Sequence, residues 1–138
     1  MLIDEFDFFL IEIFILVIKG LTEALAIDCE MVGTLDGYNQ SSSLARVSIV
    51  NEFGHCVYDK FVKPLPTETV IDYRTWVSGI RPEDIENGED FKKVREEVVE
   101  MVKGRILVGH SIKNDLDILM LKHQAQCIRD VASYKPFR

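Results

Sequence analysis

The sequence has few cysteines and no cysteine pair. Cys29, Cys56 and Cys127 are widely spaced, and none belongs to a Cys-x-x-Cys motif. An odd, scattered set of this kind argues for reduced thiols in the cytosol or nucleus and against a structural zinc site. Internal repeats and low-complexity runs are absent as well, and 47% of the 138 residues are hydrophobic. This composition excludes wholesale disorder and predicts one domain with a substantial core.

The sequence also lacks an apolar run long enough to span a bilayer. The most apolar stretch, Phe8 to Ile18, has eleven residues and includes Glu12, whereas a spanning helix needs about 20. The chain starts with three acids in its first seven residues, not with the basic region of a secretory signal. We interpret residues 1–22 as an apolar N-terminal extension, either a strand or helix buried on the domain edge or a poorly ordered segment, with no membrane partner. The alternative is a membrane-associated protein anchored by Phe8 to Ile18.

A basic surplus is missing too, since the formal net charge is −7. Residues 1–30 hold seven acids and one base, a net of −6, so the other 108 residues hold 16 acids and 15 bases, a net of −1. Bound divalent cations would make this larger part positive. The overall acidity therefore neither excludes nor supports a nucleic-acid substrate.

The first half of the chain predicts three neighbouring strands. Leu44–Val50 alternates and is rich in β-branched residues, Asn51–Gly54 is a turn, and His55–Pro64 returns as a strand. With the opening strand inside Ala24–Gly33, they predict a largely antiparallel arrangement. Gly37–Ser43 is polar and predicts a loop.

The second half predicts helix, helix, strand and helix. Arg81–Asp84 places a proline and two acids in the first turn of a short helix. A second helix starts near Asp90, with one apolar stripe. Arg105–His110 predicts a strand, and Asp115–His123 predicts a helix. The order of elements indicates an α/β sheet with helices packed on it.

Three acids stand out from this pattern. Asp28 and Glu30 interrupt the buried opening strand, and residues two apart in a strand project from the same face. Crowded carboxylates at the end of a core strand need protons, basic groups or cations to neutralise them. Asp115 begins the helix after the Arg105–His110 strand, where it either caps that helix or faces the carboxyl end of the sheet. A cluster of Asp28, Glu30 and Asp115 would offer only oxygen donors, which suit Mg²⁺ or Mn²⁺.

Four blocks of the sequence carry a family resemblance: "ALAIDCEMVG", "SLARVSIVNEFGHCVYDKFVKP", "DYRTWVSGI" and "ILVGHSIKNDLDIL". In this order and spacing they resemble the RNA exonuclease 4 family, a member of the DEDDh group of 3′–5′ exonucleases with the ribonuclease H-like fold. The resemblance implies a mixed sheet of three antiparallel strands followed by a parallel strand, with flanking helices. It assigns residues 23–138 to an exonuclease domain whose C-terminal part is missing.

The resemblance also implies a chemistry and a cellular role. It predicts hydrolysis of RNA from its 3′ end by two Mg²⁺ or Mn²⁺ ions, in ribosomal RNA processing in the nucleus, including the nucleolus. Asp28, Glu30 and Asp115 match the family's catalytic metal ligands.

Substrate-binding positions follow from the same resemblance. They are Met31, Arg74, Val77, Ser78 and Gly79, with Ile80 beside them and Trp76 as a residue that could stack on a base. The alternatives from the residues alone are core packing for Met31, a surface ion pair with Asp72 for Arg74, and a half-buried loop position for Trp76.

The family pattern also has a fourth aspartate and a histidine general base, and the sequence ends at "SYKPFR" before they would appear. We interpret His55, His110 and His123 as surface or core residues, and Asp130 as structural. The sheet then lacks a closing helix, which leaves apolar surface uncovered. We therefore expect this polypeptide to bind metal weakly and to degrade RNA poorly or not at all. The second hypothesis is a catalytically silent domain that binds nucleic acid or a partner.

Overall fold

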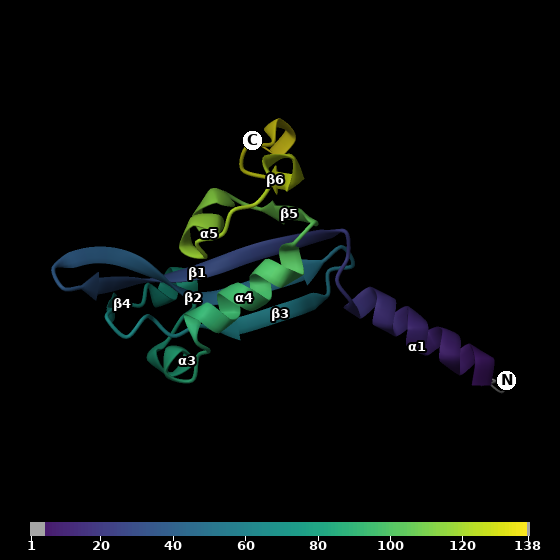
Figure 1. The fold of residues 1–138 in the computed structure, drawn as a ribbon, viewed down its shortest axis with the longest axis horizontal. Helices are drawn as coiled ribbons and strands as arrows, with labels where there is room; N and C mark the ends of the chain where they lie inside the picture. The colour runs from purple at the N-terminus through teal and green to yellow at the C-terminus, as the bar shows by residue number, and fades with distance from the viewer. Residues whose placement is uncertain (1–4, 138) are drawn as a thin grey trace.

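The computed structural model describes residues 5–137, and its centre is a six-stranded mixed sheet. The strands lie in the order β3-β2-β1-β5-β6, and β4 also pairs with β1 (Figure 1). The pairs β1–β2, β2–β3 and β1–β4 are antiparallel, whereas β1–β5 and β5–β6 are parallel. The predicted α/β sheet of three antiparallel strands followed by a parallel strand is confirmed. Residues 1–4 of the predicted extension and Arg138 of the predicted domain lie outside the described residues.

A long hairpin forms the middle of the sheet. β1 (Ala24–Asp36) and β2 (Asn39–Asn51) pair along their whole length. The predicted loop over Gly37–Ser43 is wrong beyond its first two residues, because the turn takes only two residues and starts with a glycine at φ 60°. The polar residues that suggested a loop belong to the strand, and Thr34 and Ser43 hydrogen-bond through their buried hydroxyls at 2.9 Å.

The return strand β3 (Cys56–Phe61) and the short β4 (Thr69–Asp72) complete the antiparallel part. Asn51 organises the turn between β2 and β3, because its Oδ1 accepts hydrogen bonds from the backbone N–H groups of Phe53 and His55. The predicted strand–turn–strand unit is therefore confirmed.

The parallel part of the sheet is shorter. β5 (Ile106–Gly109) lies beside β1, and β6 (Ile128–Asp130) lies beside β5. β6 was not predicted, because three residues are too few to display an alternating pattern. Between them α5 spans Lys113–Ile118, whereas the prediction was Asp115–His123; the helix ends early, and Met120 has φ 50°. Two 3-10 turns follow, η1 at Ala125–Cys127 and η2 at Lys135–Phe137.

Helices cover the sheet unequally. α4 (Phe91–Val102) packs over one face, and its predicted apolar stripe is confirmed, since Val94, Val98 and Val102 are buried in the main core. The other face has a smaller core beside α2 (Thr75–Ser78) and α3 (Pro82–Glu86). That core consists of Val32, Ala45, Ile80 and Ile85.

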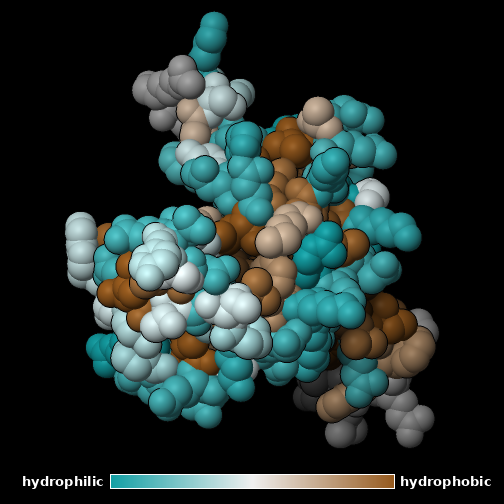
Figure 2. Space-filling view, turned by 60° about the vertical axis from the view of Figure 1, so that its left-hand side comes forward, coloured by the Kyte–Doolittle hydropathy of each residue, from teal (hydrophilic) through white to brown (hydrophobic). Residues whose placement is uncertain are grey.

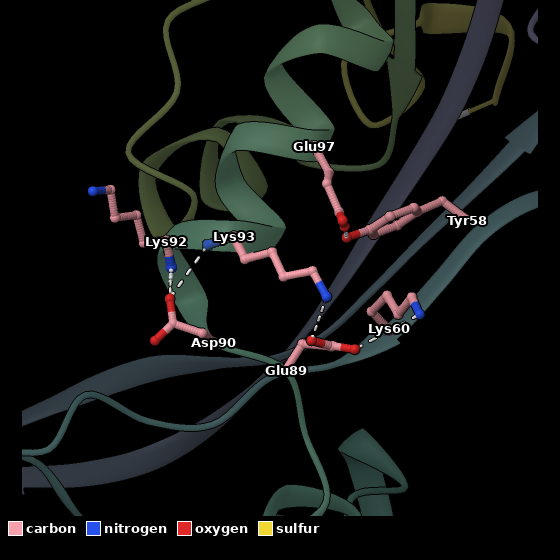
Figure 3. A network of polar contacts seen from close by, with 7 residues as sticks. All are labelled: Tyr58, Lys60, Glu89, Asp90, Lys92, Lys93 and Glu97. Atoms are coloured by element: carbon pink, nitrogen blue, oxygen red, sulfur yellow. Dashed lines mark hydrogen bonds and ion pairs between the residues drawn. The ribbon is translucent and has the colours of Figure 1, made fainter.

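Polar contacts attach α4 to β3 and to the loop before the helix (Figure 3). The Tyr58 hydroxyl donates to Glu97 Oε2 at 2.5 Å, and burial followed by this hydrogen bond raises the Tyr58 pKa above its usual range. Glu89 lies between Lys93 of the helix, at 2.8 Å, and Lys60 of the strand, at 3.9 Å. These contacts hold α4 in register over the main core.

The N-terminal segment forms α1 (Glu5–Lys19), which extends away from the sheet (Figure 1). The expectation of a buried element is wrong, because the side chains from Phe8 to Val17 are exposed. Apolar residues lie on every side of the helix, so packing one side on the sheet would leave the others in water. Asn51 Nδ2 holds the end of the segment by donating to the carbonyls of Ile18 and Gly20. Within residues 5–137, no helix is both long and apolar enough to cross a membrane.

Apolar surface is also uncovered on the body of the molecule. Figure 2 shows it gathered in a hollow near the middle of one face, with hydrophilic side chains around it. Large exposed apolar side chains of the body include Ile71, Trp76, Val77 and Met120.

Candidate active site

Strand β1 places Asp28 and Glu30 on one face of the sheet. Leu25, Ile27 and Cys29 point into the main core under α4, so the two acids between and beyond them lie on the opposite face. Asp28 is exposed and Glu30 is half-buried. The side-by-side arrangement expected from the alternation is therefore present.

Asp115 reaches this strand from α5. Its side chain is only 4% exposed, and its Oδ1 accepts a hydrogen bond of 2.8 Å from the backbone N–H of Cys29. β5 pairs with β1 only as far as Ala26 and Val108, and β4 pairs with it only from Gly33 onward, so the edge of β1 between these two points has no strand neighbour on this side. The Asp115 carboxylate supplies the missing acceptor there. It therefore lies against the residue that separates Asp28 from Glu30.

The charges of the three acids act on one another. Burial raises the pKa of Glu30, and the charges of Asp28 and then Asp115 raise it further, against an opposing effect of Arg46. Burial also raises the pKa of Asp115, and the charge of Asp28 adds to this, while the backbone N–H of Cys29 lowers it. The site is therefore a cluster of acids whose ionised forms are disfavoured until positive charge arrives.

The donor chemistry of this cluster fits a hard divalent cation, because all three groups are carboxylates. Their positions fit it less well. Within residues 5–137, no three or more His, Cys, Asp or Glu side chains come together closely enough to hold a metal ion. The assignment of Asp28, Glu30 and Asp115 as ligands thus stays a prediction.

The predicted substrate residues lie in two places. Met31 is half-buried and packs against the main core, as its alternative interpretation has it. Arg74 lies over the β1 backbone, with Nη2 3.3 Å from the position that a Cβ on Gly33 would take. Its Nη1 donates to Ser42 Oγ at 3.1 Å, whereas Asp72 receives only the backbone N–H of Arg74. The guanidinium is therefore not held by an ion pair with Asp72.

The loop after β4 exposes some of its predicted site residues and buries others. Trp76 is 92% exposed and Val77 66%, so the half-buried position considered for Trp76 is wrong. Ser78 is buried, and its hydroxyl donates to the Tyr73 carbonyl and accepts from the N–H of Ile80. With its hydroxyl occupied in this way, Ser78 shapes the loop that presents Trp76 and Val77. Gly79, the last predicted residue, ends α2 at φ 70°.

The remaining candidates have structural positions. His55 and His110 are exposed, and His123 Nε2 hydrogen-bonds the Arg105 carbonyl at 2.8 Å. Asp130 Oδ1 accepts the backbone N–H groups of Ser111 and Ala132, each at 2.9 Å. Burial opposes but does not outweigh these donors, which hold the Asp130 pKa below its usual value. Asp130 thus fixes the turn after β5, as predicted.

Sequence reasoning missed one basic residue at the site. Arg46 lies directly opposite Glu30 in the β1–β2 pairing, and its charge counts among the causes that set the Glu30 pKa. The only signal in the sequence would have been the hairpin register. That register contains a bulge between Glu30 and Met31, so counting residues from the turn would have given the wrong partner.

Known proteins resemble this chain in sequence and in fold. The exonuclease family matches residues 25–133. RNA exonuclease 4 of Xenopus tropicalis is 62% identical over 121 residues, which cover 87% of this chain and 28% of that protein. The human RNA exonuclease 4 is 60% identical over 119 residues, covering 86% of this chain and 28% of that protein. The Saccharomyces cerevisiae protein of the same name is 48% identical over 120 residues, covering 87% of this chain and 40% of that protein. The chain therefore spans less than half the length of these relatives.

Solved structures give the same result. The apo pseudoubiquitin hydrolase–RNA exonuclease module of S. cerevisiae Pan2 matches with a TM-score of 0.69 and 26% identity, over 81% of this chain and 21% of that one. The same module in complex with AAUUAA RNA matches with a TM-score of 0.68 and 26% identity, over 80% of this chain and 21% of that one. The matched region contains Asp28, Glu30 and Asp115. The chain therefore belongs to the exonuclease family, in which it is similar to the RNA exonuclease 4 proteins.

Proposed function

We propose that this chain carries the acidic site of a metal-dependent 3′–5′ exonuclease that acts on RNA. The observation that carries the proposal is the hydrogen bond from Cys29 N–H to Asp115, which ties the third acid to the backbone between the first two. The names of the relatives support RNA as the substrate, and the Pan2 module has been solved with RNA.

In this proposal the three acids are ligands of divalent metal ions. Asp28 and Glu30 would approach the ions from the β1 strand and Asp115 from α5. Divalent ions, Mg²⁺ or Mn²⁺, would activate a water and stabilise the leaving 3′ oxygen when bound. The hydrogen bond from Cys29 N–H holds Asp115 beside β1. Asp115 would therefore need little movement to become a ligand. The raised pKa values of Glu30 and Asp115 mean that bound cations also relieve repulsion within the protein.

The cellular part of the proposal comes from the family alone. The 3′ direction, ribosomal RNA processing and a nuclear location are proposed because this chain resembles RNA exonuclease 4 across most of its length.

A catalytically silent domain is the second candidate. Two observations favour it: the described residues include no group that already forms a metal site, and the three histidines lie exposed or hydrogen-bonded to a structural carbonyl. Such a domain would bind RNA, or a partner, without cleaving it.

A labelled RNA oligonucleotide distinguishes the two. With a 5′ label, removal of nucleotides from the 3′ end gives a ladder, and a 3′-phosphorylated oligonucleotide tests whether the free 3′ end is needed. Asp28→Ala is compared with Asp36→Ala, which removes an exposed acid from the same strand.

We expect a weak, metal-dependent ladder that Asp28→Ala abolishes and Asp36→Ala leaves unchanged. Retained RNA binding with no ladder at any Mg²⁺ or Mn²⁺ concentration would favour the silent domain. A strong ladder from the 138-residue chain would contradict the expected weak activity.

A further inference from the structure

We propose that Arg46 binds a phosphate of the RNA strand beside the acidic cluster, an inference that rests on the proposed function. The residue lies in one of the four family blocks, but that block contributed no predicted site residue. Its position, its rigid attachment and its unused hydrogen-bond donors carry the argument.

The hairpin register gives the position. Arg46 pairs with Glu30 across β1 and β2, and directly opposed residues project from the same face of a sheet. Arg46 therefore shares the face of Asp28 and Glu30, opposite to the face that α4 covers. It is a cation next to the acids that the proposed function places at the scissile phosphate.

Two neighbours on β3 hold the side chain. Asp59 accepts hydrogen bonds from Arg46 Nε at 2.8 Å and from Nη2 at 2.7 Å. The guanidinium carbon lies 5.2 Å from the centre of the Phe61 ring, a distance at which a cation and a ring attract each other. Ser48 donates to the same Asp59 carboxylate at 3.3 Å. The guanidinium plane is thus fixed before any ligand arrives, which lowers the entropy cost of binding.

The contacts with Asp59 and Phe61 leave part of the guanidinium available. Of its five N–H donors, Asp59 takes two, which leaves three. The side chain is 37% exposed, and the described residues contain no buried side-chain nitrogen or oxygen without a hydrogen-bond partner. Nη1, which Asp59 does not engage, is therefore not a buried, unpaired atom and can be reached by a ligand from solvent. The planar, forked N–H donors of a guanidinium match the positions of phosphate oxygens.

An isolated surface ion pair would have a smaller role. It would add a little stability and no affinity for RNA. The two roles differ in what they require of Asp59. The structural role needs both partners equally, whereas in phosphate binding Arg46 makes the contact and Asp59 only orients it, so that loss of Asp59 should cost less affinity than loss of Arg46.

The test measures binding of a fluorescein-labelled single-stranded RNA to the 138-residue chain, in EDTA and in Ca²⁺. The variants are Arg46→Gln, Arg46→Lys and Asp59→Asn. Lys93→Gln is the charge-matched control, since it removes an exposed, ion-paired cation on α4. Thermal unfolding of each variant is recorded in parallel.

We expect Arg46→Gln to weaken binding about tenfold and to lower the slope of log K against log salt by about 0.7, the loss of one contact to a single strand. Arg46→Lys should recover the slope but only part of the affinity, because lysine lacks the paired, planar N–H donors of arginine. Asp59→Asn should unfold at the same temperature as Arg46→Gln yet keep most of the RNA affinity. Lys93→Gln should leave binding unchanged.

Equal loss of affinity in Arg46→Gln and Asp59→Asn, or none in either, would overturn the inference. The inference and the proposed function can fail independently, because Asp28→Ala tests the proposed function through the effect of Ca²⁺ on RNA binding. A Ca²⁺ effect lost in Asp28→Ala with no effect of Arg46→Gln would leave the function standing and remove the inference. Weaker binding by Arg46→Gln, together with a Ca²⁺ effect that survives in Asp28→Ala, would keep the phosphate contact and remove the metal site. Absence of RNA binding would refute both.

Discussion

Replacing Asp115 by asparagine should stabilise the metal-free protein at neutral pH. Asparagine keeps an Oδ1 that can accept the hydrogen bond from Cys29 N–H, but it carries no charge. In the native protein, burial and the charge of Asp28 raise the Asp115 pKa in spite of that hydrogen bond. The ionised side chain is therefore a net cost to the fold when no cation is present.

The magnitude follows from opposing effects. The neutral amide loses the extra strength of a charge-assisted hydrogen bond, about 1 kcal/mol. It removes the desolvation of a carboxylate that is only 4% exposed and the repulsion from Asp28, and the direction of the pKa shift shows that these two outweigh the bond. We expect a net gain of about 0.5–2 kcal/mol, the usual size of a single stabilising substitution. For a chain of this size that is a rise in Tm of roughly 2–8 °C.

Thermal unfolding between pH 4 and pH 8 in EDTA is the assay. A carboxyl whose pKa is raised in the folded state contributes stability at acid pH, and loses it as the pH rises from its ordinary 3.8 through the raised value. The advantage of Asp115→Asn should thus be largest at pH 7–8 and disappear toward pH 4. Asp117→Asn is the control on the same helix: Asp117 is exposed and paired with Lys113, so its loss should change stability by less than about 0.5 kcal/mol.

Metal ions give a second comparison. Saturating Mn²⁺ should raise the Tm of the native protein, since a ligand that binds only the folded state stabilises it, and should raise that of Asp115→Asn less. If Asp115→Asn proved destabilising by the same amount at pH 5 and pH 8, Asp115 would be an ordinary structural hydrogen-bond acceptor. The electrostatic account of the site would then be refuted.

Substitutions at three further positions test how the fold supports the site. Tyr58→Phe removes the hydroxyl that donates to Glu97 and should cost about 1 kcal/mol, measured by urea unfolding; an unchanged midpoint would mean that the contact does not hold α4. Asp90→Ala removes the side chain that accepts two backbone N–H groups at the start of α4 and should cost about 1 kcal/mol, while Asp90→Ser, which can still cap, should recover most of it. Gly88→Ala places a Cβ 2.9 Å from the carbonyl carbon of Val62 and should cost about 1–3 kcal/mol; a Tm equal to that of the native protein would show that this loop yields.

The acids of the site could be read from the sequence because their chemistry conflicts with their surroundings. Asp28 and Glu30 interrupt an apolar strand, and the period of a strand alone places them on one face. The order of predicted strands and helices indicated the α/β sheet, and Asp115 was found at the start of the helix that follows the Arg105–His110 strand. The helix α4 was equally readable, since Asp90 and the valine stripe are local signals.

Contacts between distant residues were not readable in this way. The bond between Asp115 and Cys29 joins positions 86 residues apart, and it exists because β5 stops short along β1. Arg46 faces Glu30 only because of a register that includes a bulge. Neither the length of a paired strand nor a bulge leaves a mark in local composition.

The sequence by itself therefore determined which groups carry charge and on which side of their own strand or helix they lie, because these depend on residue type and local period. Only the tertiary structure decided which of the charges meet, because strand register, strand length and the exposed position of α1 result from packing over the whole chain.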